Sequence, residues 1–283
     1  MNADRGKLRQ RLPQSPQAGG AKQAARKQWG ENPCGAHVAR DQEFGTREFF
    51  ESIERYRYQV YAPWMKELIG FDDYPGKRLL EVGCGTGTDL LQFARGGALV
   101  TGFDLTPRSI EIARRRFEVY GLAGEFANGD AENLSFADET FDVVYSFGVI
   151  HHTPDTERAA SEIYRVLRKG GQAIVMIYHR TSLYYWGGIM FKRGLLRGQL
   201  LRESPSALMS RYVEHTETGG RPLVKAYTRK EALRLFRDFR KCEAHVHQLT
   251  RPELGLAGRL LPEDAFQRLA RSFGWNILIK ATK

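Results

Sequence analysis

The sequence predicts an α/β fold: a doubly wound, mostly parallel, seven-stranded sheet with an N-terminal helix and an inserted lid. Three observations lead to this prediction. Short apolar runs alternate with helix-length amphipathic segments, a glycine-rich turn follows the first apolar run, and a basic segment interrupts the alternation late in the chain. Strands that alternate with helices are typical of parallel sheets whose crossover helices cover both faces.

The expected strands are short runs rich in apolar residues. They cover residues 79–82, 99–103, 125–128, 141–146, 172–178, 242–249 and 275–281. The expected helices cover residues 88–95, 107 onward, 156–167, 228–239 and 262–272. Pro107 suits the first turn of a helix, the pair Gly170–Gly171 is expected to end the helix at 156–167, and Thr228 is the expected N-cap of the helix that follows it.

The segments ahead of the sheet predict a tail and a cap. Residues 1–27 hold seven Lys/Arg and one Asp, a net charge of +6, with almost no large apolar residues. We therefore expect a disordered basic tail. Residues 28–75 form the expected N-terminal helical cap, because apolar and aromatic side chains from Phe49 to Leu68 recur at roughly helical spacing and indicate one long helix.

The rest of the chain predicts one α/β domain with an insertion. Residues 76–180 are the expected cofactor-binding core, and residues 226–283 are the expected C-terminal part of the same domain. Residues 181–225 interrupt the alternation and are expected to form a lid. The stretch 190–241 holds thirteen Lys/Arg and five Asp/Glu, a net charge of +8, so the basic charge is concentrated here and in the tail.

Composition argues against several classes of protein. No run of eighteen apolar residues indicates a membrane-spanning helix, and the polar first residues lack the apolar stretch of a secretory signal. The three cysteines are an odd number in a long chain, so a disulfide framework is not expected. These features favour a cytoplasmic protein, and no cluster of metal ligands is expected.

The strongest functional signal is the turn Glu81–Gly87, which reads Glu-Val-Gly-Cys-Gly-Thr-Gly. Glycines let the backbone turn sharply and approach a ligand closely. Asp104 follows Gly83 by 21 residues, a spacing that suits a carboxylate accepting both ribose hydroxyls of a nucleoside. A dinucleotide fingerprint would have a third glycine in place of Thr88, and Glu81 would repel a pyrophosphate. S-adenosylmethionine carries an ammonium and a sulfonium instead, so the sign of the charge favours it.

Further motifs resemble those of the class I S-adenosylmethionine-dependent methyltransferases over about residues 76–180. They are the Glu-x-Gly-x-Gly-x-Gly turn, Gly102-Phe103-Asp104-Leu105, Gly129–Leu134, Phe141–Ser146 and Arg165–Gly171. The chain resembles in particular the subfamily of the ubiquinone and menaquinone biosynthesis methyltransferases. This resemblance implies a Rossmann-like methyltransferase fold with S-adenosylmethionine as the cofactor.

The resemblance also implies roles for individual residues. Asp104 would bind the ribose and Asp130 the adenine amino group. Gly83, Gly85 and Ser146 would line the methionine end of the site. The full set of expected cofactor-binding residues is Glu81, Gly83, Gly85, Gly87, Asp104, Leu105, Asp130, Ala131, Glu132 and Ser146.

The loop Gly148–Pro154 follows the fourth strand and is expected to face the transferred methyl group, because ligands lie at the carboxyl ends of parallel strands. It contains His151 and His152, and a histidine side chain is a natural general base near neutral pH. Each is a candidate catalytic residue. The alternative is that one or both histidines only hold the loop through hydrogen bonds, and the sequence does not distinguish between the two residues.

The cap and the insertion are expected to cover the acceptor. The candidate lining residues are Arg47, Tyr56, Tyr58, Tyr178, His179, Tyr184 and Tyr185. Aromatic side chains in a cap suit a flat or apolar acceptor. The alternative for each of them is an ordinary role in packing.

The sequence thus predicts methyl transfer to a small aromatic or apolar acceptor, with O- or C-methylation favoured. Two alternatives stay open. One is an RNA or protein methyltransferase that uses the basic tail and insertion, and the other is a binding module that keeps the cofactor fold without chemistry. The run Tyr184–Trp186, followed by Lys192-Arg193, also indicates a peripheral contact with a membrane. The acceptor, the accepting atom and the oligomeric state stay open.

Overall fold

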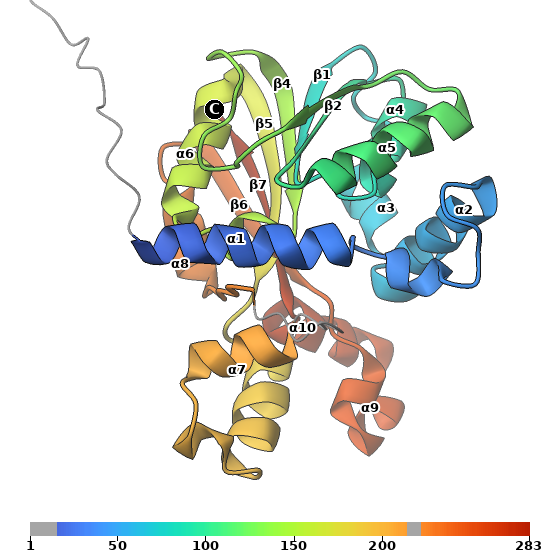
Figure 1. Ribbon diagram of the computed structural model, residues 1–283. Coiled ribbons are helices and arrows are strands. Elements are labelled where there is room, and N and C mark those ends of the chain that lie inside the picture. The colour runs from blue at the N-terminus through green and yellow to red at the C-terminus, as the bar shows by residue number, and fades with distance from the viewer. Residues whose placement is uncertain (1–15, 214–221) are drawn as a thin grey trace, which may run out of the picture.

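The computed structural model describes residues 16–213 and 222–283 and shows a central sheet with helices on both faces (Figure 1). Seven strands lie in the order β3-β2-β1-β4-β5-β7-β6. Their bounds are β1 Arg78–Val82, β2 Leu99–Asp104, β3 Glu125–Asn128, β4 Phe141–Phe147, β5 Leu167–Tyr178, β6 Lys241–His247 and β7 Asn276–Thr282. Only β7 is antiparallel to its neighbours, β5 and β6. The predicted fold class is confirmed.

The order of the strands reverses at β1, which pairs in parallel with β2 on one side and with β4 on the other. A reversal of this kind leaves a crevice outside the carboxyl ends of the two central strands, because the connections that leave them run to opposite faces of the sheet. The glycine turn that follows β1 and the histidine loop that follows β4 both begin at this crevice.

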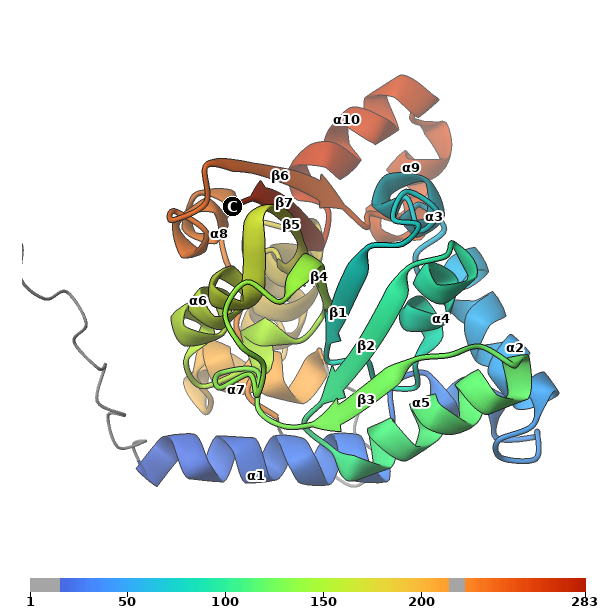
Figure 2. The same cartoon turned by 90° about the horizontal axis from the view of Figure 1, so that it is seen from above.

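The sheet separates two hydrophobic cores, because successive side chains of a strand point to opposite faces. Leu79 packs with α4 and α5 in one core, and Leu80 packs with α6 and α8 in the other. Figure 2 shows these two pairs of helices on opposite sides of the sheet. The bounds are α4 Thr88–Arg95, α5 Pro107–Tyr120, α6 Thr156–Val166, α8 Arg229–Leu235 and α10 Glu263–Phe273.

Two predicted helix starts are confirmed by their caps. The Thr106 hydroxyl accepts a hydrogen bond from the Ser109 backbone at 3.2 Å, and Pro107 occupies the first turn of α5. Thr228 and Glu231 form a reciprocal capping box at the start of α8. Each cap satisfies backbone N–H groups that the first helical turn leaves without a partner.

The prediction for Gly170–Gly171 is wrong. Helix α6 already ends at Val166, and both glycines lie inside β5, where the register against β4 shifts. Gly170 has a φ of 77°, and a Cβ on Gly171 would lie 2.9 Å from the carbonyl oxygens of Arg168 and Asp142. These glycines therefore allow an irregularity within a strand, a role that glycine also has in bulges.

The long helix predicted for the cap is interrupted. The structure has α2 at Arg47–Arg55, a π-helical turn η2 at Tyr56–Tyr61 and a separate α3 at Met65–Ile69. Ala62, between the last two, has φ −142° and ψ 70°, outside the helical region. Ala62 precedes Pro63, and the residue before a proline is disfavoured in the α conformation.

The disorder prediction for residues 1–27 is wrong from residue 16 onward, and residues 1–15 lie outside the described residues. Helix α1 spans Pro16–Glu31 and crosses the carboxyl end of the sheet (Figure 1). Lys22, Ala25 and Gln28 are buried, at 7%, 6% and 2% exposure. The helix has too few large apolar side chains to be stable alone, and its stability comes from tertiary contacts with the rest of the protein.

The described part of the insertion between β5 and α8 is largely helical. It contains the π-helix η4 at Tyr184–Leu195, the short η5 at Gln199–Leu201 and α7 at Pro205–Tyr212, while residues 214–221 of the predicted lid lie outside the described residues. A second small unit, η6 Arg251–Leu254 and α9 Leu256–Leu260, lies between β6 and α10. Among the helices described, none is both long and apolar enough to span a membrane.

Candidate active site

A cavity of about 1220 Å³ opens at the carboxyl ends of β1, β2 and β4. Gly83, Asp104 and Val149 line it from the sheet side. Trp29 and Arg57 line it from the opposite side, so α1 and the chain up to η2 form the second wall. The cavity therefore combines the predicted cofactor turn with the predicted cap, and it also reaches Lys22 and Ala25, which lie in the segment that the sequence indicated to be a disordered tail.

The glycine turn has the geometry that its sequence predicts. Gly83, Gly85 and Gly87 all have positive φ, at 78°, 50° and 72°. A Cβ on Gly83 would lie 2.2 Å from Val149 Cγ2, so only glycine allows this approach to the loop after β4. Gly83 and Gly85 line the cavity. Gly87, which precedes α4, packs on Ala113 of α5 and does not line the cavity.

Asp104 joins the end of β2 to the glycine turn. Its Oδ2 accepts a hydrogen bond from the Gly85 backbone at 3.0 Å, and its Oδ1 accepts from the Thr106 backbone at 2.9 Å. Burial raises the pKa of Asp104, and the hydrogen bonds oppose that rise. Asp104 and the adjoining Leu105 line the cavity, so a fixed carboxylate faces the place expected for a ribose.

Glu81 is a buried carboxylate that also lines the cavity. Its Oε2 has no hydrogen-bond partner among residues 16–213 and 222–283. Burial and the negative charge of Asp89 raise the pKa of Glu81 well above its usual value of 4.5. A buried carboxylate with one oxygen that lacks a hydrogen bond is costly for the protein alone, and a cation bound beside it removes that cost. The ammonium group of S-adenosylmethionine fits this position.

Asp130 lies at the far side of the cavity in contact with α1. Lys22 Nζ of α1 pairs with Asp130 Oδ2 at 2.6 Å and also with Glu132. Asp130 and Ala131 line the cavity, whereas Glu132 does not and instead accepts a hydrogen bond from the Asp155 backbone at 2.7 Å. Glu132 thus joins α1 to the start of α6.

Ser146 does not reach the cavity. Its side chain is fully buried and donates a hydrogen bond to the Val82 carbonyl at 3.0 Å, which joins β4 to β1. It is absent from the residues that line the cavity. Ser146 lies near the end of β4, as predicted. Its side chain does not face the cavity but bonds to Val82, the last residue of β1 before the glycine turn.

A buried network around Asp89 was missed in the sequence. The Asp89 carboxylate accepts hydrogen bonds from Tyr58 at 2.7 Å, from Tyr145 at 2.8 Å, and from two nitrogens of Arg57. Arg57 also stacks over the Phe147 ring at 4.2 Å and lines the cavity. The sequence did offer a signal for this network. Asp89 lies in the first turn of α4, directly after the glycine turn, and an acid at that position is held close to the bound ligand.

The two histidines have different surroundings, although they are adjacent in η3, Ile150–His152. His152 lines the cavity, and its Nδ1 lies 2.8 Å from the Leu223 carbonyl. His151 is fully buried and does not line the cavity, and neither of its ring nitrogens has a hydrogen-bond partner among the described residues. Burial, helped by His152 and Lys225, lowers the pKa of His151 well below 6.5. The structure therefore places only His152 where a substrate can reach it.

The predicted lining residues divide into two groups. Tyr56, Tyr178 and Tyr184 line the cavity, whereas Arg47, Tyr58, His179 and Tyr185 do not. Sequence reasoning missed lining residues at distant points of the chain, which are Trp29, Cys34, His37, Arg40, Arg57, Phe147, Met176 and Trp275. No local motif marks them, because helix α1 and the strand ends meet only in the folded protein.

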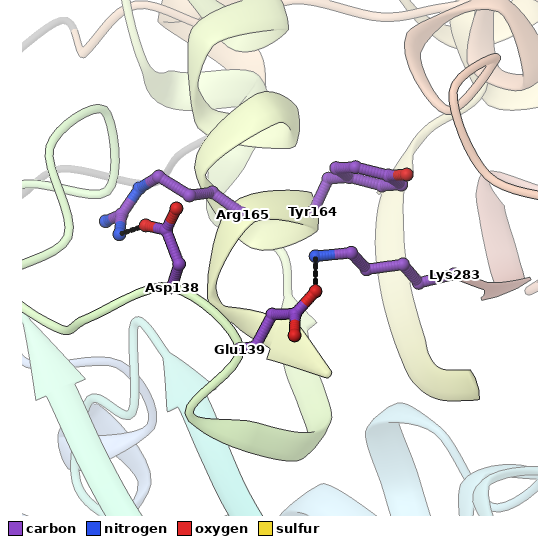
Figure 3. Close-up of a pocket in the computed structure, with 5 residues that line it drawn as sticks. All are labelled: Asp138, Glu139, Tyr164, Arg165 and Lys283. Atoms are coloured by element: carbon purple, nitrogen blue, oxygen red, sulfur yellow. Dashed lines mark hydrogen bonds and ion pairs between the residues drawn. The ribbon is translucent and has the colours of Figure 1, made fainter. Parts of the chain in front are cut away.

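A smaller pocket of about 360 Å³ lies at the opposite end of the sheet (Figure 3). Arg165 pairs with Asp138 at 2.7 Å, and Lys283 lies 3.8 Å from Glu139, beside the Tyr164 ring. The four charged side chains of this pocket pair with one another and tie the end of α6 to the strands. Its role is structural, and the larger cavity is the candidate active site.

The comparison with known families agrees with this geometry. Residues 80–175 match the family model described as a methyltransferase domain. Over these residues the chain is similar to a methyltransferase domain, and its fold is that of solved S-adenosylmethionine-dependent methyltransferases. Matching solved structures that are less than 25% identical support the fold alone. They include a possible histamine N-methyltransferase from Thermotoga maritima, with a TM-score of 0.52, 24% identity and coverage of 82% of this chain and 94% of that one.

Three relatives carry more sequence similarity. The phthiotriol/phenolphthiotriol dimycocerosates methyltransferase of Mycobacterium leprae is 46% identical over 34% of this chain and 36% of its own length. The fatty-acid O-methyltransferase of Mycolicibacterium smegmatis is 39% identical over 43% of each chain. The ubiquinone biosynthesis O-methyltransferase of Cereibacter sphaeroides is 35% identical over 49% of this chain and 56% of its own length. The similarity thus spans less than two thirds of each relative.

Proposed function

We propose that the protein transfers the methyl group of S-adenosylmethionine to a hydroxyl group of a small lipid-like or quinone-like acceptor, with His152 as the general base. The observation that carries this proposal is the division of the cavity. Glu81 and Asp104 lie at the carboxyl ends of β1 and β2, and His152 lies among aromatic rings after β4.

At the cofactor end, the chain supplies two fixed carboxylates. When bound, S-adenosylmethionine would supply a methyl group on a sulfonium, whose carbon an acceptor atom would attack in line with the departing sulfur. Glu81 accepts the ammonium group, and Asp104, held by Gly85 and Thr106, accepts the ribose hydroxyls. Because both carboxylates are positioned before binding, little reorganisation is needed when the cofactor enters.

At the acceptor end, the tautomer of His152 is set by its backbone contact. A carbonyl oxygen only accepts hydrogen bonds, so Nδ1 must donate to Leu223 and the neutral ring keeps its lone pair on Nε2. The acceptor hydroxyl gives its proton to Nε2 while its oxygen forms the new bond to the methyl carbon. The sulfur–methyl bond would break with its electron pair on sulfur, and the Leu223 carbonyl would stabilise the imidazolium of His152 that results.

The walls at this end suit a flat or apolar molecule. The Trp29 ring lies edge-on to His152, 5.7 Å between centroids, and Tyr178 stacks on Trp275 at 4.6 Å. All four side chains line the cavity. Aromatic walls favour apolar acceptors, and the relatives named for fatty-acid and ubiquinone-biosynthesis O-methylation support a lipid-like or quinone-like class.

The test is an acceptor panel with methyl-labelled S-adenosylmethionine: an alkylated hydroquinone, a long-chain fatty acid, an alkylamine and an RNA transcript. We expect label in the hydroquinone, and a His152→Gln variant about a hundredfold slower on it. On the fatty acid, whose carboxylate is already ionised, the same variant should lose little. Label in the amine or the RNA alone, or in none of the four, would overturn the proposal.

A further inference from the structure

Two helical units project beyond the carboxyl end of the sheet and end on the same side of the molecule (Figure 1). One is the insertion η4–η5–α7, and the other is η6–α9. Eight of the twelve large apolar side chains that are exposed in the described part of the chain lie on these units. We call these eight side chains the basal surface, and they are Trp186, Phe191, Leu195, Leu196, Leu200, Leu201, Leu256 and Leu260.

The basal surface is not needed for the packing of the insertion. Ile189 and Met190 of η4 are buried, as are Leu208 and Met209 of α7, and they form the inner side of the insertion. The Leu196 backbone bonds to the Phe191 carbonyl, five residues back, so side chains four or five apart share one side of η4. Leu201 and Leu260 are 91% and 83% exposed, and exposed apolar side chains that gather in this way indicate a contact with another molecule.

The charge between these side chains is strongly positive. Residues 184–213 contain five Lys/Arg and one acid, Glu203, which pairs with Arg211 at 2.6 Å. Lys192, Arg197 and Arg202 are exposed between the apolar side chains. Apolar side chains interleaved with exposed cations are the composition of segments that lie in the interface of an anionic bilayer.

We propose that the basal surface docks on an anionic lipid bilayer. The leucines and Trp186 enter the boundary between headgroups and acyl chains, and Lys192, Arg197 and Arg202 contact the lipid phosphates. Tyr184, the first residue of η4, and Val213, which directly follows α7, line the active-site cavity, so the docked insertion is also one wall of the site. The docking itself does not depend on the identity of the acceptor.

Charge and chemistry favour a bilayer over two other occupants. A symmetric contact with a second copy of this chain would bring two equally positive surfaces together, which repel. An RNA would use the cations but gain nothing from exposed leucines, because its affinity comes from phosphate contacts and base stacking. Of these three occupants, only a lipid interface uses both kinds of side chain.

The experiment is sedimentation of the full chain with vesicles of phosphatidylcholine, with or without one third phosphatidylglycerol. We expect binding to the anionic vesicles and much weaker binding to the neutral ones. The variant K192Q/R197Q/R202Q should lose about fivefold in affinity per cation removed, and L195S/L196S/L201S should lose tenfold or more. S-adenosylmethionine affinity of each variant, measured by calorimetry, shows that the fold and the proposed active site are intact.

Two matched controls define the outcome. Leu99→Ser removes a leucine that is 62% exposed at the start of β2, at the other end of the strands, and Lys241→Gln removes an exposed cation from β6. Neither should change vesicle binding. The proposal is overturned if both vesicle types bind equally, if the leucine variant binds like the wild type, or if the leucines instead govern self-association in sedimentation velocity or binding to an RNA oligonucleotide.

Discussion

The two ends of the cavity are built in different ways. The cofactor end comes from consecutive strands and turns of the core, with Glu81, Gly83, Gly85 and Asp104 all within the first two strands and their turns. The acceptor end is assembled from α1, η2, the ends of β4 and β5, η4 and the residue before β7. A local motif encodes the first end, whereas only tertiary packing forms the second. The cofactor-binding end of the cavity can therefore be predicted from the sequence, whereas the acceptor-binding end cannot.

The largest effect is expected at the cofactor end. Asp104→Ala should lower S-adenosylmethionine affinity by about a hundredfold, because it removes a buried carboxylate and leaves the Gly85 and Thr106 backbone groups without their acceptor. Calorimetry measures the loss. Asp142→Asn, at the amino end of β4 and paired with Arg168, is the control and should leave the affinity unchanged. Equal affinity in Asp104→Ala and wild type would refute the assignment.

A smaller, pH-dependent effect is expected at Glu81. Its raised pKa means that the folded protein holds the proton more tightly than the unfolded chain, so the free energy of unfolding falls as pH rises from 4.5 through the raised value. Cofactor affinity should rise over the same interval, because the ammonium favours the ionised carboxylate.

Glu81→Gln should bind S-adenosylmethionine about tenfold more weakly at the top of this range. It should also flatten most of the pH dependence, leaving the part due to Asp104, whose pKa burial also raises. Calorimetry in two buffers with different ionisation enthalpies counts the protons released on binding. A proton count identical in the variant and the wild type would show that another group titrates.

The smallest effect is expected where α1 joins the two ends. Lys22→Gln leaves Asp130 and Glu132 without their cation, so α1 should open and cofactor affinity should fall about fivefold. Limited proteolysis of α1 measures the opening. Lys27→Gln removes an exposed cation from the same helix and should behave like the wild type. A truncation that starts at Gln28 should match or exceed the Lys22 effect, and a truncation with full affinity would argue against α1 as a wall.

Strand positions and the cofactor turn could be predicted from sequence because each depends on local chemistry. Hydrophobic runs locate β1 and β2 to within one residue, and Gly83 needs its positive φ whatever surrounds it. The orientation of a side chain was harder to predict. Ser146 and Glu132 lie at the expected places, but they hydrogen-bond within the protein scaffold and do not face the cavity.

The cap was predicted least well because its stability comes from contacts made far along the chain. Helix α1 has a polar composition, and its order depends on Lys22 reaching residues more than a hundred positions away. The π-helical turn after α2 brings Arg57 to Asp89, a contact that helical periodicity alone does not reveal. Adjacent histidines likewise gave no sequence signal to separate a buried ring from one that lines the cavity.

The most direct test of the account compares the two histidines on one set of preparations. Cofactor affinity and turnover on an alkylated hydroquinone are measured for the wild type, His152→Gln and His151→Gln, with thermal unfolding as the check on stability. We expect His152→Gln to lose about a hundredfold in turnover while its cofactor affinity stays within about twofold. His151→Gln should keep its turnover at temperatures where it is folded. Turnover near that of the wild type in His152→Gln would contradict the account.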